Sequence, residues 1–120
     1  MNKHIVELAK NRAEESTFRF RLGAVIFNKK TILGMGYNKP YKTHPKSNTP
    51  YKTIHAEFDA AVGLWSSEPL EGASIYVHRL GRDGKVRLAR PCKHCIAMLK
   101  GYGLKRMFYS TEEGYNEEAL

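Results

Sequence analysis

Two short motifs carry the residue types that could do chemistry, His55-Ala56-Glu57 and Pro91-Cys92-Lys93-His94-Cys95. Cys92 and Cys95 are three residues apart, so on a helix they share one face. A helix N-terminus at this point favours the thiolate form, which binds zinc. Two thiolates are too few for a zinc site. His55 offers a nitrogen as a third ligand, and a fourth position left to water is typical of catalytic zinc sites.

Glu57 is the candidate for proton transfer. Zinc lowers the pKa of its bound water toward neutrality. A carboxylate beside that water could take its proton and deliver it to a base nitrogen and to a leaving amine. His55 and Glu57 would be about 200° apart on a regular helix. They can converge only if the site lies at a helix end, with Glu57 reaching back.

The remaining histidines are expected to lie outside the metal site. His94 sits between the two cysteines and is interpreted as an exposed bystander. His44 is interpreted as a loop residue, and His4 and His78 as structural or surface residues.

The elements that position these motifs follow from hydrophobic periodicity and turn signals. Helices are predicted over residues 2–16, 54–65 and 91–100, the second capped by Thr53. Strands are predicted over residues 21–28, 31–37, 73–80 and 104–110, with a short return strand over 85–89. Residues 38–52 read as a polar loop, and the residues after Ser110 as an acidic tail. Strands alternating with helices predict parallel neighbours joined by right-handed crossovers, in a mixed sheet with helices on both faces.

Length and composition predict one globular domain over residues 1–120. Apolar residues make up 42% of the chain and charged residues 27%, which excludes a disordered protein. No apolar run approaches the roughly 18 residues of a membrane span, so no membrane partner is expected. The two cysteines form one Cys-x-x-Cys pair, which points to metal or redox chemistry in a reducing compartment. The N-terminus lacks the apolar core of a signal peptide, so a cytoplasmic location is expected.

His-x-Glu together with Pro-Cys-x-x-Cys is the signature of zinc-dependent nucleobase deaminases. The chain resembles the cytidine and deoxycytidylate deaminase family in both motifs. Three further stretches resemble the family, namely Leu22–Ile26 as its first strand, Gly36-Tyr37-Asn38 as the loop after its second strand, and Gly103–Tyr109 as the strand after the cysteine helix. The resemblance covers roughly residues 16–110 and is nearest to small bacterial or phage deoxycytidylate deaminases.

The resemblance implies an α/β fold, a three-layer α/β/α sandwich with a five-stranded mixed sheet. It implies one Zn²⁺ per chain, held by His55, Cys92 and Cys95, with Glu57 as the catalytic residue. The implied reaction converts cytosine to uracil, by attack of zinc hydroxide on C4 and loss of ammonia. Asn38 would hydrogen-bond the sugar, and the backbone at Ala56 would lie against the base. The further candidates for substrate contact are Tyr37, Arg21 and Arg90.

Three features depart from deoxycytidylate deaminases. Residues Arg79 to Arg90 intervene between the third strand and the Pro-Cys motif. The chain has no spare cysteine for a second, structural zinc. Residues Lys39 to His44 replace the glycine-rich stretch that usually follows the asparagine.

The charge of the chain leaves two substrate classes open. The net charge is +8, and basic residues concentrate beside the metal motifs. The loop contributes Lys39, Lys42, Lys46 and Lys52 interleaved with Tyr37, Tyr41 and Tyr51, and the insert contributes Arg79, Arg82, Lys85, Arg87 and Arg90. Cations with aromatic rings are typical of a groove for single-stranded nucleic acid. Alternatively, a few of these residues bind one phosphate and the others form a solvated face.

The predicted substrate is therefore a cytosine-containing nucleotide or nucleoside, or cytosine in single-stranded DNA or RNA. A tRNA adenosine deaminase and a non-catalytic zinc module are weaker alternatives, and the second has no need of Glu57. Oligomerisation is left open by the sequence.

Overall fold

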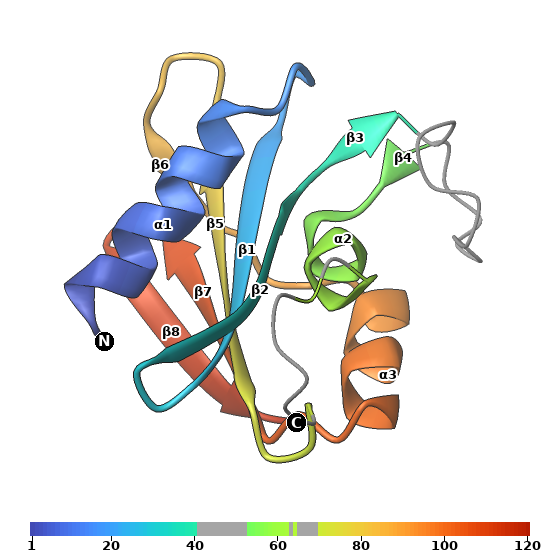
Figure 1. Cartoon of the computed structure of the whole chain (residues 1–120). Coiled ribbons are helices and arrows are strands. Elements are labelled where there is room, and N and C mark those ends of the chain that lie inside the picture. The colour runs from blue at the N-terminus through green and yellow to red at the C-terminus, as the bar shows by residue number, and fades with distance from the viewer. Residues whose placement is uncertain (41–52, 63, 65–69) are drawn as a thin grey trace.

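A six-stranded mixed sheet forms the centre of the computed structural model, which describes residues 1–40, 53–62, 64 and 70–120 (Figure 1). Five strands lie side by side in the order β2-β1-β5-β7-β8, and a sixth, β6, pairs with β5 off this path. Their bounds are β1 (Arg21–Asn28), β2 (Thr31–Tyr37), β5 (Ser74–Leu80), β6 (Val86–Arg87), β7 (Arg106–Thr111) and β8 (Gly114–Ala119). A separate two-stranded sheet pairs β3 (Lys39–Pro40) with β4 (Thr53–Ile54).

Strand β1 is antiparallel to both of its neighbours, β2 and β5. Strands β5 and β7 are parallel and are joined through the helix α3 (Lys93–Gly101), as the alternation of strands and helices predicts. The mixed α/β sheet expected from the sequence is thus confirmed.

Helices cover both faces of this sheet, which gives three layers (Figure 1). The helix α1 (Lys3–Glu14) lies on one face, where Ile5 and Ala9 pack with Val25, Phe27 and Tyr76. The helix α2 (Ala56–Val62) and α3 lie on the other face, where their buried side chains pack with the alternate residues Ala24, Ile26, Ile75 and Val77. None of the helices in the described part of the chain is long and apolar enough to cross a membrane.

The C-terminal segment differs from its prediction as an acidic tail, because it forms the edge strand β8. Its side chains are mostly exposed, so it lacks the alternation of apolar and polar residues that marks a strand in a sequence. Basic side chains neutralise its acids instead. Arg106 on β7 reaches Glu117 at 3.1 Å, and Arg90 reaches Glu118 at 2.7 Å.

The two helices that carry the motifs begin later than the sequence predicts. Helix α2 begins at Ala56, and Thr53 belongs to β4 rather than capping the helix. The His55 carbonyl accepts the N–H of Asp59 at 3.0 Å, which makes His55 the residue just before the helix. Helix α3 begins at Lys93, and Cys92 is its N-cap with extended backbone angles. The loop over 41–52 and the last residues of the predicted helix 54–65 lie outside the described residues.

Gly36 sets how closely α2 packs against β2. A Cβ atom at Gly36 would lie 2.4 Å from the backbone nitrogen of Ala60 and 2.7 Å from the Cβ of Asp59. No other residue type fits between the strand and the helix at this distance. The glycine therefore fixes the position of α2, and with it the start of the helix where His55 and Glu57 lie.

Candidate active site

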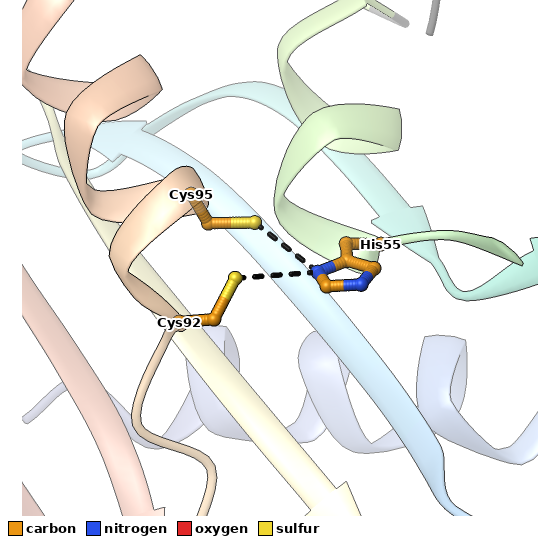
Figure 2. A group of neighbouring side chains, drawn as sticks. All are labelled: His55, Cys92 and Cys95. Carbon is orange, nitrogen blue, oxygen red and sulfur yellow. Dashed lines mark hydrogen bonds between the residues drawn. The ribbon is translucent and has the colours of Figure 1, made fainter. Parts of the chain in front are cut away.

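His55, Cys92 and Cys95 meet where two helices begin (Figure 2). His55 precedes α2, Cys92 caps α3, and Cys95 lies in the first turn of α3. The His55 Nδ1 atom is 3.7 Å from the Sγ of Cys92 and 3.4 Å from the Sγ of Cys95. All three potential ligand atoms lie within 4.8 Å of one another. The structure thus brings together the three residues that the sequence predicts as metal ligands.

The spacing of these atoms fits a zinc ion. With Zn–S near 2.3 Å and Zn–N near 2.0–2.1 Å, a tetrahedral site places sulfur and nitrogen ligands about 3.6 Å apart. The observed sulfur–nitrogen distances are 3.4 and 3.7 Å. Three protein ligands leave one tetrahedral position for water or substrate, which is the arrangement of catalytic rather than structural zinc sites.

The electrostatics of the three side chains also fit a cation. Burial raises the pKa of the Cys95 thiol strongly, and the nearby Glu57 and Cys92 raise it further. A divalent cation offsets both the burial and the negative neighbours, and deprotonates a coordinating thiol. Burial, with a smaller contribution from the charge of His94, lowers the pKa of His55. His55 is therefore neutral at neutral pH and offers a lone pair to a metal.

Glu57 lies beside the cysteines with only 4% of its surface exposed. Burial raises the pKa of its carboxyl to about 6, while hydrogen bonds from its own backbone N–H and from Cys95 act in the opposite direction. The sequence requires a helix end if His55 and Glu57 are to converge. The structure provides one, because His55 stands before the first turn of α2 and Glu57 within it.

A cleft of about 350 Å³ opens over this group. His55, Glu57 and Cys92 contribute to its lining, and the other lining residues are Phe18, Arg19, Phe20, Leu22, Asn38, Arg79, Leu88, Ala89 and Arg90. The cleft is therefore walled by the segment before β1, the end of β5, and the segment between β6 and α3. Its lining thus combines two of the three metal-ligand candidates and Glu57 with the arginines Arg19, Arg79 and Arg90.

Two of the five predicted substrate residues, Asn38 and Arg90, line the cleft. The side-chain oxygen of Asn38 accepts the N–H of Leu22 at 2.9 Å, and its amide nitrogen donates to the Phe20 carbonyl at 2.7 Å. Asn38 thus ties the end of β2 to the start of β1. Whether it also contacts a sugar stays a prediction.

The other three predicted substrate residues are not among the lining residues of the cleft in the described part of the chain. Arg21 donates to the carbonyl of Gly81 at 3.0 Å. The ring of Tyr37 lies under the ammonium group of Lys39, 4.4 Å from its centroid. Ala56 is fully buried between His55 and Glu57.

Sequence reasoning missed Phe18, Arg19 and Phe20, which form one wall of the cleft. Phe20 is 50% exposed, and its ring lies 4.3 Å below the guanidinium of Arg79. The alternation of aromatic and basic residues just before a buried strand is the signal that could have identified this segment. Arg79 lies in β5, at the start of the stretch from Arg79 to Arg90 whose basic residues were expected to flank the metal motifs.

A second hollow of about 340 Å³ adjoins the cleft and shares Arg19, Phe20 and Arg79 with it. Its other lining residues are Gly81, Arg82, Asp83 and Arg87. Arg87 is paired with Asp83 at 2.9 Å, which leaves the hollow with a surplus of positive charge.

The remaining histidines that the structure describes lie outside the metal-ligand group, as the sequence predicts. His94 and His4 are exposed, and His78 is buried in the layer under α1, away from the cysteines. His44, with the predicted loop residues Lys42, Lys46, Lys52, Tyr41 and Tyr51, lies outside the described residues.

Comparison with known proteins finds one family model, the cytidine and deoxycytidylate deaminase zinc-binding region, which matches residues 1–111. Among solved structures, the chain is similar to the dCMP deaminase of the cyanophage S-TIM5, with 25% identity and a TM-score of 0.69 over 91% of this chain and 81% of that one. The same enzyme in complex with dCMP and dUMP matches with a TM-score of 0.62, again at 25% identity, over 91% of this chain and 82% of that one.

The cytidine deaminase of Mycobacterium leprae shares the fold, with 17% identity and a TM-score of 0.59 over 96% of this chain and 91% of that one. No curated protein matches the chain.

Proposed function

The chain belongs to the cytidine and deoxycytidylate deaminase family, and we propose that it hydrolyses the 4-amino group of cytosine in a phosphorylated cytosine nucleotide, releasing ammonia and leaving uracil. The observation that carries this proposal is the placement of a buried carboxylate, Glu57, beside the group of His55, Cys92 and Cys95, at a cleft that Glu57, His55 and Cys92 line. A purely structural metal site has no need of that carboxylate or of the cleft.

The proposed roles follow from the donor set and from the burial of each group. His55, Cys92 and Cys95 would hold one zinc ion, which when bound makes water a nucleophile at neutral pH. Glu57 takes the proton of the attacking water, delivers a proton to N3 of the base, and then protonates the amine that leaves. The balance is one water and one cytosine consumed, and one uracil and one ammonia formed. Burial of Glu57 keeps bulk water from competing for these protons.

A phosphate on the substrate is supported by the arginines at the cleft. Arg19 and Arg79 border it, and Arg79 is held by the ring of Phe20 and by a hydrogen bond of 3.3 Å to the carbonyl of Leu88. The Nε of Arg79 is buried and makes no hydrogen bond with the described residues. An arginine fixed in this way suits a phosphate, whose oxygens can accept its remaining N–H groups. The cyanophage dCMP deaminase was solved with dCMP and dUMP, which agrees with a monophosphate substrate here.

A second candidate is deamination of cytosine within single-stranded nucleic acid. The observation in its favour is the second basic hollow beside the cleft, which could receive a neighbouring phosphate. Binding through several phosphates would weaken steeply as salt rises.

A cytoplasmic location, suited to the free thiols of Cys92 and Cys95, stays a prediction.

The experiment offers the zinc-loaded protein dCMP, deoxycytidine, cytidine and a single-stranded oligonucleotide containing one cytosine, and measures ammonia and uracil. The expected result is turnover of dCMP with a kcat/KM at least about tenfold above that of deoxycytidine, since a charged hydrogen bond contributes about that factor. Arg79→Gln should reduce this preference. Arg106→Gln is the control, because Arg106 lies on β7, pairs with Glu117 and is not among the described residues that line the cleft. This variant should keep the preference for dCMP. Turnover of the oligonucleotide alone would favour the second candidate, and release of ammonia from none of the four would contradict both.

A further inference from the structure

Arg90 connects the rim of the cleft to the C-terminal strand. Its side chain lines the cleft, and it stands two residues before the metal-binding residue Cys92. Its Nε donates to one carboxylate oxygen of Glu118 at 2.7 Å, and its terminal nitrogen donates to the other oxygen at 3.0 Å. Glu118 lies on β8, a strand that the sequence did not predict.

Glu118 is itself held in place by a third donor. The hydroxyl of Tyr109, on the neighbouring strand β7, donates to the same oxygen that accepts from the Nε of Arg90. Hydrogen bonds from Arg90 and Tyr109 lower the pKa of Glu118 to about 2, so the carboxylate is ionised over the working range of pH. A bidentate ion pair between a guanidinium and a carboxylate fixes the plane of the guanidinium as well as its position.

The pair is too exposed to contribute much to folding. The side chains of Arg90 and Glu118 are 48% and 36% exposed, and exposed ion pairs contribute little to stability. The residue before Arg90 is also held to β7 without this pair, because the N–H of Ala89 donates to the Ser110 carbonyl at 2.9 Å. The geometry that the pair imposes on Arg90 is therefore its larger effect.

We propose that Glu118 is a positioning residue, which holds the guanidinium of Arg90 at the cleft so that Arg90 can contact the substrate. A guanidinium has five N–H donors, and Glu118 uses two, so three remain for a ligand. The inference rests on the proposed function, because the contact that it predicts is made to a cytosine nucleotide. It assigns to the C-terminal strand a part in substrate binding that the two metal motifs do not disclose.

Glu118→Gln tests the inference, because glutamine keeps the shape of the side chain and loses its charge. Glu117→Gln is the matched control, since Glu117 is the adjacent residue on the same strand and pairs with Arg106. With dCMP as substrate, Glu118→Gln should raise KM about tenfold, while kcat and the melting temperature stay near the wild-type values. Arg90→Gln should raise KM similarly, and the double variant should be no worse than either single variant, because the two residues act as one unit.

A second measurement does not depend on turnover. The ¹H–¹⁵N resonance of the Arg90 Nε–H should be visible in the wild-type protein and in Glu117→Gln, and should be lost to fast exchange with water in Glu118→Gln. An unchanged KM in Glu118→Gln would overturn the inference, whether or not the melting temperature of the variant falls.

Failure of the proposed function gives a different result. Wild-type protein that turns over no nucleotide contradicts the deaminase proposal itself. The NMR measurement then decides the inference, because an Arg90 resonance that survives in Glu118→Gln refutes the positioning role and one that disappears supports it.

Discussion

Replacing Gly36 by alanine should move helix α2, which carries the proposed catalytic residue Glu57, without replacing that residue. The added Cβ would lie 2.4 Å from the backbone nitrogen of Ala60, and ordinary contact begins at 3.4 Å, so the helix or the strand must move by about 1.0 Å (3.4 − 2.4). Strand β2 cannot give way freely, because Gly36 is paired with Ala24 in the sheet. Helix α2 must therefore shift, together with Glu57 in its first turn.

Two effects of different size should follow from this shift. Overpacking of this kind costs about 1–3 kcal/mol of the free energy of unfolding, which corresponds to a melting temperature lower by roughly 4–12 °C for a chain of this length. A catalytic group displaced by about 1 Å loses on the order of a hundredfold in rate. The loss of kcat should therefore exceed what the fraction of unfolded protein explains.

The assay compares kcat for dCMP and thermal unfolding of Gly36→Ala with those of Gly101→Ala. Gly101 ends α3, and a Cβ atom there would meet nothing within 4 Å. Gly101→Ala should be neutral or slightly stabilising, because alanine restricts the unfolded chain. Wild-type kcat and wild-type stability in Gly36→Ala would refute the reasoning that α2 is held by close contact with β2.

The remaining predictions concern zinc binding, the pH dependence of stability, and the contacts of Asp59 in α2. Cys95→Ser should reduce bound zinc from about one ion per chain to nearly none at low micromolar free zinc, as measured by metal analysis after gel filtration. Burial lowers the pKa of His78 from 6.5 to about 4, so the unfolded chain binds a proton that the folded chain does not. The contribution of His78 to stability is nearly complete above pH 6.5, and roughly 3 kcal/mol of it should be lost as the pH falls from 6.5 to 4. In urea unfolding, the stability of the wild type should therefore fall relative to that of His78→Gln over this range.

Asp59 accepts the Tyr37 N–H at 3.1 Å and pairs with Lys39 at 3.0 Å. Its side chain is only 7% exposed, so Asp59→Asn should lower the free energy of unfolding by about 2 kcal/mol in urea. An unchanged value would mean that Asp59 does not hold the segment from Tyr37 to Lys39 to the helix.

The metal ligands were predictable because their signal is local. The spacing of Cys92 and Cys95 places them together at the start of a helix, whatever the rest of the chain does. The convergence of His55 and Glu57 required a helix end, and the structure has one at Ala56. The order of helices and strands followed from hydrophobic patterning. Strands β1 and β5 are buried on both faces, so each stands out in the sequence as a short, nearly continuous apolar run.

The cleft wall was less predictable because it depends on contacts distant in sequence. Phe20 and Arg79 are 59 positions apart and meet only once β1 pairs with β5. Arg90 and Glu118 likewise meet only because β8 forms, and β8 is stabilised by charges on its neighbours rather than by a buried face. Arg21 was expected at the substrate, but its side chain donates a hydrogen bond to the carbonyl of Gly81. This contact depends on the conformation of the turn after β5, which lies 60 positions away in the sequence.

Glu57→Gln in the zinc-loaded protein tests the proposed chemistry most directly. Glutamine fills the same buried space but cannot move the protons. We predict that the variant keeps one zinc ion per chain and a melting temperature close to that of the wild type, while deamination of dCMP falls by a factor on the order of a thousand. Loss of zinc would mean that Glu57 is a metal ligand, and undiminished release of ammonia would mean that another group moves the protons. Either result would contradict the proposed mechanism.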